Sequence, residues 1–133
     1  MNKKIVDFVK ECGIFYIATS ERGNARVRPF TFIEEIDGKI YFATGTEKEV
    51  YKQLKNNPYF EICAALKDGS KWIRARACAS FDDLLSVKQK VFEIMPDLIE
   101  IYGSPASPKF TVFYAKSIEA SIFSIAGGCE KIV

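Results

Sequence analysis

Two Asp-Gly pairs, Asp37-Gly38 and Asp68-Gly69, constrain the fold more than any other feature of this sequence. Each pair lies between two short runs rich in aromatic and β-branched residues. Asp-Gly is a preferred two-residue loop of a β-hairpin, because both positions of a type I′ turn need a positive φ. A hairpin joins antiparallel strands, whereas parallel strands need a long crossover connection, usually a helix. The sequence therefore predicts consecutive hairpins and an antiparallel sheet.

Runs of aromatic and β-branched residues predict the strands of this sheet. We expect them at residues 14–20, 25–36, 39–44, 59–66, 71–81 and 110–125, the last of which supplies one or two strands. Pro29 has no N–H to donate to a ladder, so it should interrupt the second strand.

Apolar residues at helical spacing predict the helices. Ile5, Phe8, Val9 and Cys12 indicate a first helix that Gly13 ends. Further helices are expected at residues 47–56, at 83–94 with Asp82 as its cap, and in a short segment that ends near Tyr102.

About six antiparallel strands with three hydrophobic helices around them predict an α+β, mainly β, fold, namely a small closed or split barrel. The chain has 133 residues, of which 48% are hydrophobic, and this is enough to bury a core. No repeat or linker divides the sequence, so residues 1–133 are predicted to form a single domain.

The composition argues against several classes of function. A formal net charge of +2 is too small to indicate nucleic-acid binding. The sequence has no histidine, and its four cysteines form no CxxC pair, so we predict no metal site. No apolar run approaches the length of a membrane span, and the N-terminus is a poor signal peptide. We therefore expect no membrane partner and a cytoplasmic location.

The sequence TGTEKE, residues 44–49, follows one strand and begins a helix. Thr46 and Glu49 match a capping box, in which each side chain satisfies an exposed backbone N–H. The alternative is an anion site, because a helix N-terminus carries a partial positive charge. Its ligands would be Thr44, Gly45, Thr46 and Lys48. A Glu49 carboxylate folded onto the cap would repel a phosphate, so the residues alone leave both interpretations open.

Two arginines and a proline form a second group, in the sequence RVRPF at residues 26–30. Arg26 and Arg28 share one face of a strand, where they could simply be solvated. Pro29 belongs at a sheet edge or a bulge, where unpaired backbone groups could bond a planar heterocycle.

The third group is WIRARACAS, residues 72–80, whose residues alternate between two faces. One face carries Ile73, Ala75, Ala77 and Ala79, and a row of alanines predicts close packing inside a narrow barrel or against a second subunit. The other face carries Trp72, Arg74 and Arg76. Trp72 could stack on a ligand, but a core or interface position is favoured.

No catalytic group of side chains stands out in the sequence. Without histidine there is no Ser-His-Asp or Cys-His arrangement, and neither a GxGxxG nor a P-loop motif occurs. Any chemistry is therefore expected to come from a bound cofactor.

Taken in order, these motifs resemble the pyridoxamine 5′-phosphate oxidase-like family of flavin-binding split β-barrels. The matching segments are ARVRPF, DGKIYFAT, the Thr/Gly turn with Lys48, VYKQLKNNPYFEIC, WIRARACASF and MPDLIEIY. They span nearly the whole chain, and the short single-domain bacterial members are the most similar. The resemblance implies a six-stranded antiparallel split barrel with flanking helices. It also implies a homodimer with FMN in two clefts at the subunit interface.

Matched residue by residue, the resemblance implies a cofactor site and favours the phosphate interpretation of residues 44–48. The implied FMN-binding residues are Arg28, Pro29 and Phe30 along the flavin ring, Thr44, Gly45, Thr46 and Lys48 at the phosphate, and Trp72 near the ring. The spacing from Lys48 to Leu54 is longer than in the oxidases, which leaves Lys52 as an alternative phosphate ligand.

The resemblance implies an FMN-dependent oxidoreductase that passes electrons from NADH or NADPH to a small organic acceptor. The true oxidases hold pyridoxal with an arginine and a histidine in a longer C-terminal segment, so this histidine-free chain is not expected to oxidise vitamin B6. Relatives that reduce nitroimidazoles share the fold, but nothing in the sequence selects that substrate. The alternatives are a flavin-binding carrier or sensor, or the same cleft holding deazaflavin F420 or haem.

Overall fold

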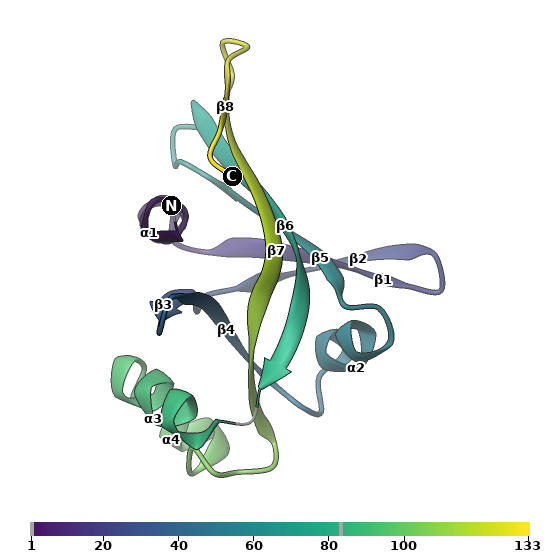
Figure 1. Cartoon of the computed structure of the whole chain (residues 1–133), viewed down its shortest axis with the longest axis vertical. Helices are drawn as coiled ribbons and strands as arrows, with labels where there is room; N and C mark the ends of the chain where they lie inside the picture. Colours follow the sequence, from purple (N-terminus) through teal and green to yellow (C-terminus); the bar gives the residue numbers. More distant parts are fainter. Residues whose placement is uncertain (1, 83) are drawn as a thin grey trace.

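The predicted hairpins form one antiparallel sheet with helices around it (Figure 1). The structure is a computed structural model that describes residues 2–82 and 84–133. The strands follow the order β2-β1-β5-β6-β7-β4-β3, and β8 pairs with β7. Their bounds are β1 Phe15–Glu21, β2 Asn24–Phe30, β3 Glu34–Ile36, β4 Lys39–Gly45, β5 Tyr59–Ala65, β6 Lys71–Asp82, β7 Phe110–Ser124 and β8 Cys129–Lys131.

The α+β class with an antiparallel sheet is confirmed, but within the described part of the chain the sheet has eight strands rather than six. One extra strand arises because the chain leaves the sheet after Phe30, so β2 and β3 are separate. The other arises because the chain turns back after β7 at Gly127, whose φ is 102°, and adds β8. The predicted interruption at Pro29 is wrong, since Pro29 lies within β2 opposite Tyr16. An edge strand tolerates proline, and β2 is at an edge.

Tight turns set the register of the first hairpins. Asp37 and Gly38 have φ values of 52° and 78°, and Ile36 pairs with Lys39 across them, which confirms the predicted hairpin. The β1–β2 hairpin turns in the same way at Arg22 and Gly23, with φ values of 52° and 81°. The second Asp-Gly pair lies in the loop of the β5–β6 hairpin, as predicted.

The described residues form four helices that flank the sheet: α1 Asn2–Cys12, α2 Glu49–Asn56, α3 Leu85–Ile94 and α4 Leu98–Tyr102. Gly13 ends α1 as predicted, with φ at 91° and its N–H donating to the Val9 carbonyl. The Asp82 carboxylate accepts the backbone N–H of Leu84 at 2.8 Å, just before α3 begins. Among the described residues, no helix has the length and hydrophobicity that crossing a bilayer requires.

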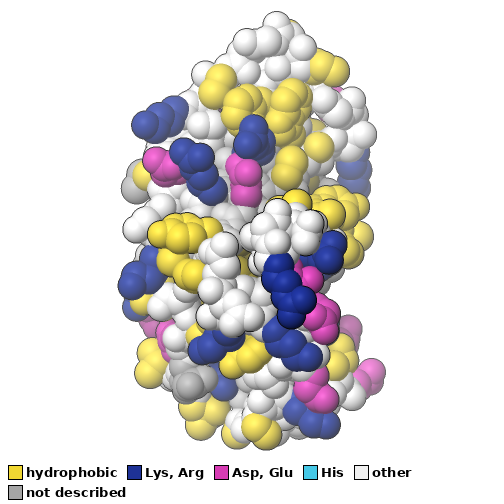
Figure 2. Space-filling view, turned by 90° about the vertical axis from the view of Figure 1, so that its right-hand side faces the viewer, with side chains coloured by type: hydrophobic (Ala, Val, Ile, Leu, Met, Phe, Trp, Pro, Cys, Tyr) yellow, Lys and Arg dark blue, Asp and Glu magenta, His cyan; other side chains and the backbone are white. Residues whose placement is uncertain are grey.

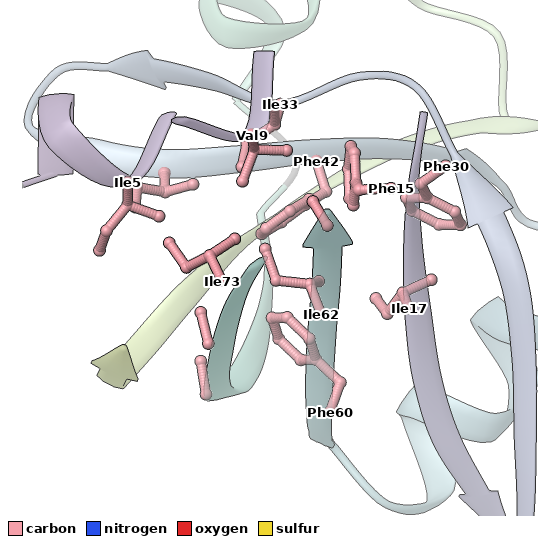
Figure 3. Packing of buried hydrophobic residues seen from close by; sticks show 14 of the residues in the cluster. Ile5, Val9, Phe15, Ile17, Phe30, Ile33, Phe42, Phe60, Ile62 and Ile73 are labelled. Carbon is pink, nitrogen blue, oxygen red and sulfur yellow. The ribbon is translucent and has the colours of Figure 1, made fainter. Parts of the chain in front are cut away.

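The main core lies inside the curved sheet, where aromatic rings from several strands meet (Figure 3). Phe113 of β7 is fully buried, and its ring centroid lies 5.2 to 6.3 Å from those of Phe30, Phe42, Phe60 and Phe81. The alanine row of β6 faces this core, which confirms the predicted alternation. The small side chains of that row leave space for these large rings.

A second, smaller core lies between α3, α4 and the outer side of β3, β4 and β7. Its buried residues are Phe32, Ile36, Tyr41, Val87, Val91, Phe92, Leu98, Phe110 and Val112. Figure 1 shows α3 and α4 together at one end of the long β6–β7 pair. The two helices therefore cover the end of the sheet at which β4 leads into α2.

Candidate functional site

A cavity of about 380 Å³ lies where β2, the end of β4, the start of α2 and the α4 helix meet. Its size falls within the range of small-molecule sites. Five of the predicted FMN-binding residues line it, namely Arg28, Pro29, Phe30, Thr44 and Lys48. The helices contribute apolar side chains, including Leu98 and Ile101. Segments far apart in the sequence thus line one cavity.

Arg28 is a half-buried cation that meets only neutral oxygens. Its Nη1 donates to the Ile17 carbonyl at 3.3 Å and to Thr19 Oγ1 at 2.8 Å, and its Nη2 donates to Gln53 Oε1 at 2.6 Å. Burial lowers the pKa of its guanidinium from the ordinary value. Among the described residues no carboxylate pairs with Arg28, so the cavity has a positive charge that an anionic or electron-rich ligand could balance.

Thr44 is the second uncompensated group. Its side chain is only 4% exposed, and its Oγ1 has no hydrogen-bond partner among the described residues. Buried hydroxyls almost always have a partner, so an orphaned one in a cavity wall fits a ligand atom that the site is built to bind. Its place at the end of β4 puts it near the start of α2, where an anion is favoured.

The start of α2 differs from the predicted capping box. The helix begins at Glu49 with Lys48 as its N-cap, and no side chain caps it. The Thr46 hydroxyl donates to the Pro108 carbonyl at 3.0 Å, and its N–H donates to the Lys109 carbonyl at 2.9 Å. These bonds hold Thr46 against the segment before β7, so of the two interpretations left open by the sequence the capping box is ruled out. No acidic side chain therefore caps the N-terminus of α2 among the described residues.

The structure separates the two lysines that could hold a phosphate. Lys48 lines the cavity, whereas Lys52 lines a different hollow beside the β1–β2 turn. Lys52 pairs with Glu49 at 3.7 Å, and Glu49 is exposed rather than folded over the N-terminus of α2. The geometry therefore favours Lys48.

Tyr102, at the end of α4, also lines the cavity. The sequence does not predict it as a site residue. A Cβ atom added to Gly45 would lie 2.8 Å from the Tyr102 hydroxyl oxygen, so the absence of a side chain at Gly45 lets the phenol approach β4. Burial raises the pKa of the Tyr102 phenol above its ordinary value. Gly45 thus shapes the cavity wall rather than lining it.

Replacing Gly45 with alanine should displace Tyr102 and lower the free energy of unfolding by about 1 kcal/mol. The cost is modest because the closest atom is the far end of a side chain that can shift. Urea unfolding of Gly45→Ala, Tyr102→Phe and the double variant would measure it. Gly45→Ala should lower the free energy of unfolding by less in the Tyr102→Phe background, because that variant lacks the hydroxyl. Equal costs in both backgrounds would contradict the close contact.

Trp72 lies apart from the cavity of its own chain. Its ring stacks on that of Phe123 at 5.8 Å with an interplanar angle of 14°. It is ten positions along β6 from Asp82, the residue nearest the Thr44 end of β4, and this corresponds to about 30 Å. Within one chain, Trp72 therefore does not join the other predicted residues.

A second hollow of about 400 Å³ lies on the outer face of β1, β5 and β6, lined in part by Tyr59, Cys78 and Arg76. Arg76 pairs with Glu119 at 2.6 Å, so its charge is already balanced. Unlike the cavity at Thr44, this surface carries no orphaned polar group within the described part of the chain. We therefore place the candidate site at the cavity.

Residues 1–121 match the family described as pyridoxamine 5′-phosphate oxidase. This chain belongs to the pyridoxamine 5′-phosphate oxidase family. The sequence resemblance is thus confirmed at the level of the family. No curated protein matches the chain.

Solved structures share the fold of this family member. A NimC/NimA family protein from Clostridium acetobutylicum is 38% identical with a TM-score of 0.90, over 97% of this chain and 89% of that one. General Stress Protein 26 from Bacillus anthracis is 15% identical with a TM-score of 0.74, over 98% of each chain. A pyridoxamine 5′-phosphate oxidase-related, FMN binding protein from Nostoc punctiforme is 13% identical with a TM-score of 0.70, over 99% and 93%. The last two similarities show the shared fold alone.

Proposed function

We propose that this protein binds FMN in the cavity between β2, β4, α2 and α4 and is a flavin-dependent oxidoreductase. The observation that carries the proposal is the pairing, in one cavity, of an orphaned buried hydroxyl at Thr44 with an uncompensated cation at Arg28. Family membership and the FMN binding named for the Nostoc punctiforme relative support the choice of cofactor. The electrons would come from NADH or NADPH and pass to a small organic acceptor.

The residues present fit the two ends of FMN. Thr44 and Lys48 offer a hydroxyl and an ammonium beside the uncapped N-terminus of α2, which suits the dianionic 5′-phosphate. Arg28, Pro29 and Phe30 lie together on edge strand β2, which suits the flat ring. Bound FMN would supply the hydride and electron transfer. The side chains of the protein would bind and orient it and exclude water.

We also propose that the protein is a homodimer with the cofactor at the subunit interface. Tyr16 and Tyr59 expose 50% and 70% of their surface on the outer face of β1 and β5, beside the second hollow. Figure 2, which views the side of α2 and the β1–β2 hairpin, shows hydrophobic side chains gathered on the surface in its upper part. A second copy would also bring another Trp72 that could approach the flavin.

Light scattering should give twice the 15.0 kDa mass of one chain, and a monomer at concentrations that bind FMN would contradict the dimer.

Flavin binding is tested on the purified wild-type protein by its visible spectrum and by titration with FMN. We expect a yellow protein, or a colourless one that takes up FMN at micromolar concentrations. A protein that binds no FMN at these concentrations would overturn the proposal. Mass spectrometry of any released ligand separates FMN from deazaflavin F420 and haem.

Catalysis is tested separately by stopped-flow reduction of the bound flavin. We expect NADH or NADPH to bleach the flavin absorbance in the absence of oxygen. A bound flavin that neither donor reduces would favour a carrier or sensor over an oxidoreductase.

A further inference from the structure

Gln53 is a polar residue in an apolar position. It lies on the inward face of α2 between Val50 and Leu54 and is only 4% exposed. Its partner Thr19 of β1 is 5% exposed. The Thr19 hydroxyl donates to Gln53 Oε1 at 2.6 Å. Burying two polar side chains is costly unless they are bonded, so this pair calls for an explanation beyond packing.

The pair contacts one end of the Arg28 guanidinium. Thr19 Oγ1 accepts from Nη1 and Gln53 Oε1 accepts from Nη2, and the two oxygens are themselves bonded to each other. They therefore occupy the edge between the two terminal nitrogens. A guanidinium has five N–H groups, and the bonds to Ile17, Thr19 and Gln53 use three of them. The opposite edge, formed by Nε–H and the second Nη2–H, has no acceptor among the described residues.

The neutrality of these acceptors sets Arg28 apart. Arg26, Arg74 and Arg76 each pair with a carboxylate, from Glu21, Glu61 and Glu119 respectively. Arg28 is instead held by hydrogen bonds to an amide, a hydroxyl and a carbonyl. These groups fix its orientation without cancelling its charge. The free edge is a two-donor fork, which matches two adjacent acceptor atoms on a ligand.

We propose that Thr19 and Gln53 are positioning residues that hold Arg28 charged, with its free edge directed at the two adjacent acceptors, N1 and O2, of the flavin ring. The inference rests on the proposed binding of FMN and deepens it. Negative charge gathers at N1 and O2 when flavin is reduced, so an uncompensated cation there stabilises the reduced form. A carboxylate at position 53 would pair with Arg28 and remove that effect.

The test compares Gln53→Glu with wild type, and uses Gln89→Glu on the exposed side of α3 as a control that adds the same charge elsewhere. We expect Gln53→Glu to weaken binding of FMN and of riboflavin equally, by about tenfold, and to shift the midpoint potential of bound flavin to a more negative value. Gln89→Glu should match wild type. Thr19→Val, which keeps the shape of the side chain, should weaken both ligands to a smaller extent and provides the test if Gln53→Glu does not fold.

The outcomes separate this inference from the proposed function. Wild-type protein that binds neither flavin would overturn the proposed function and this inference with it. Flavin binding with no change in affinity or potential in either variant would overturn the inference alone. A loss confined to FMN would place Arg28 at the phosphate and would likewise overturn it.

Discussion

Replacing Phe113 with alanine should lower the free energy of unfolding by about 3–5 kcal/mol. The Phe113 side chain is fully buried in β7, and its ring is the common neighbour of four other aromatic rings in the main core. Those rings come from β2, β4, β5 and β6, so the cavity left by alanine could not close by the movement of one strand. Urea unfolding followed by circular dichroism would measure the change.

Two controls make the Phe113 result specific. Phe113→Leu keeps most of the volume and should cost clearly less than the alanine. Ile125→Ala removes a hydrophobic side chain that is 76% exposed and should change the unfolding free energy by less than about 0.5 kcal/mol. A Phe113→Ala loss no larger than that of Ile125→Ala would mean that the aromatic cluster is not the centre of the fold.

Replacing Lys48 with alanine should weaken FMN binding by about ten- to a hundredfold and leave riboflavin binding nearly unchanged. Lys48 lines the cavity beside the uncapped start of α2, and within the described chain no acidic side chain pairs with it. Its loss would remove a charge-assisted bond to the phosphate, a group that riboflavin lacks. Quenching of flavin fluorescence on binding would give both affinities.

Lys52→Ala is the matched control for Lys48, since it removes the same charge from the same helix. Lys52 lines another hollow and already pairs with Glu49, so its loss should change the affinity for FMN little. If Lys52→Ala bound FMN more weakly than Lys48→Ala, the phosphate would be assigned to the other side of α2. If Lys48→Ala lost affinity for FMN and for riboflavin equally, the assignment of the phosphate to this site would be wrong.

Local signals predicted the parts of the fold that depend on local chemistry. The hairpin at Asp37-Gly38 depends only on the positive φ values of these two residues. The alternation of buried and exposed side chains in β6 depends only on a strand with one buried face. The capping box failed because Thr46 bonds to carbonyls some sixty residues later in the chain. No pattern around residue 46 contains that information, and tertiary contacts override local preference there.

The sequence predicts those residues of the candidate site that lie within a family motif. Arg28 and Thr44 were found through the order of the family's motifs, whereas Thr19, Gln53 and Tyr102 were not. Their roles depend on contacts across 25 to 34 positions for Gln53, and on a missing Cβ atom for Tyr102. One signal for Gln53 was nevertheless available. It sits at helical spacing between Val50 and Leu54, and a polar residue on an apolar helix face suggests a buried partner.

Pro29 also bears on how the protein avoids aggregation. The two-residue β1–β2 loop closes on the pair Glu21 and Asn24, and bonded and non-bonded pairs alternate from there along the ladder. Pro29, opposite Tyr16, falls on a non-bonded pair, so its nitrogen faces the open side of β2. A strand from another molecule that extended the sheet would find a donor missing there, beside the uncompensated positive charge of Arg28. The edge at which we propose that the flat cofactor binds is thereby protected against fibril-like growth.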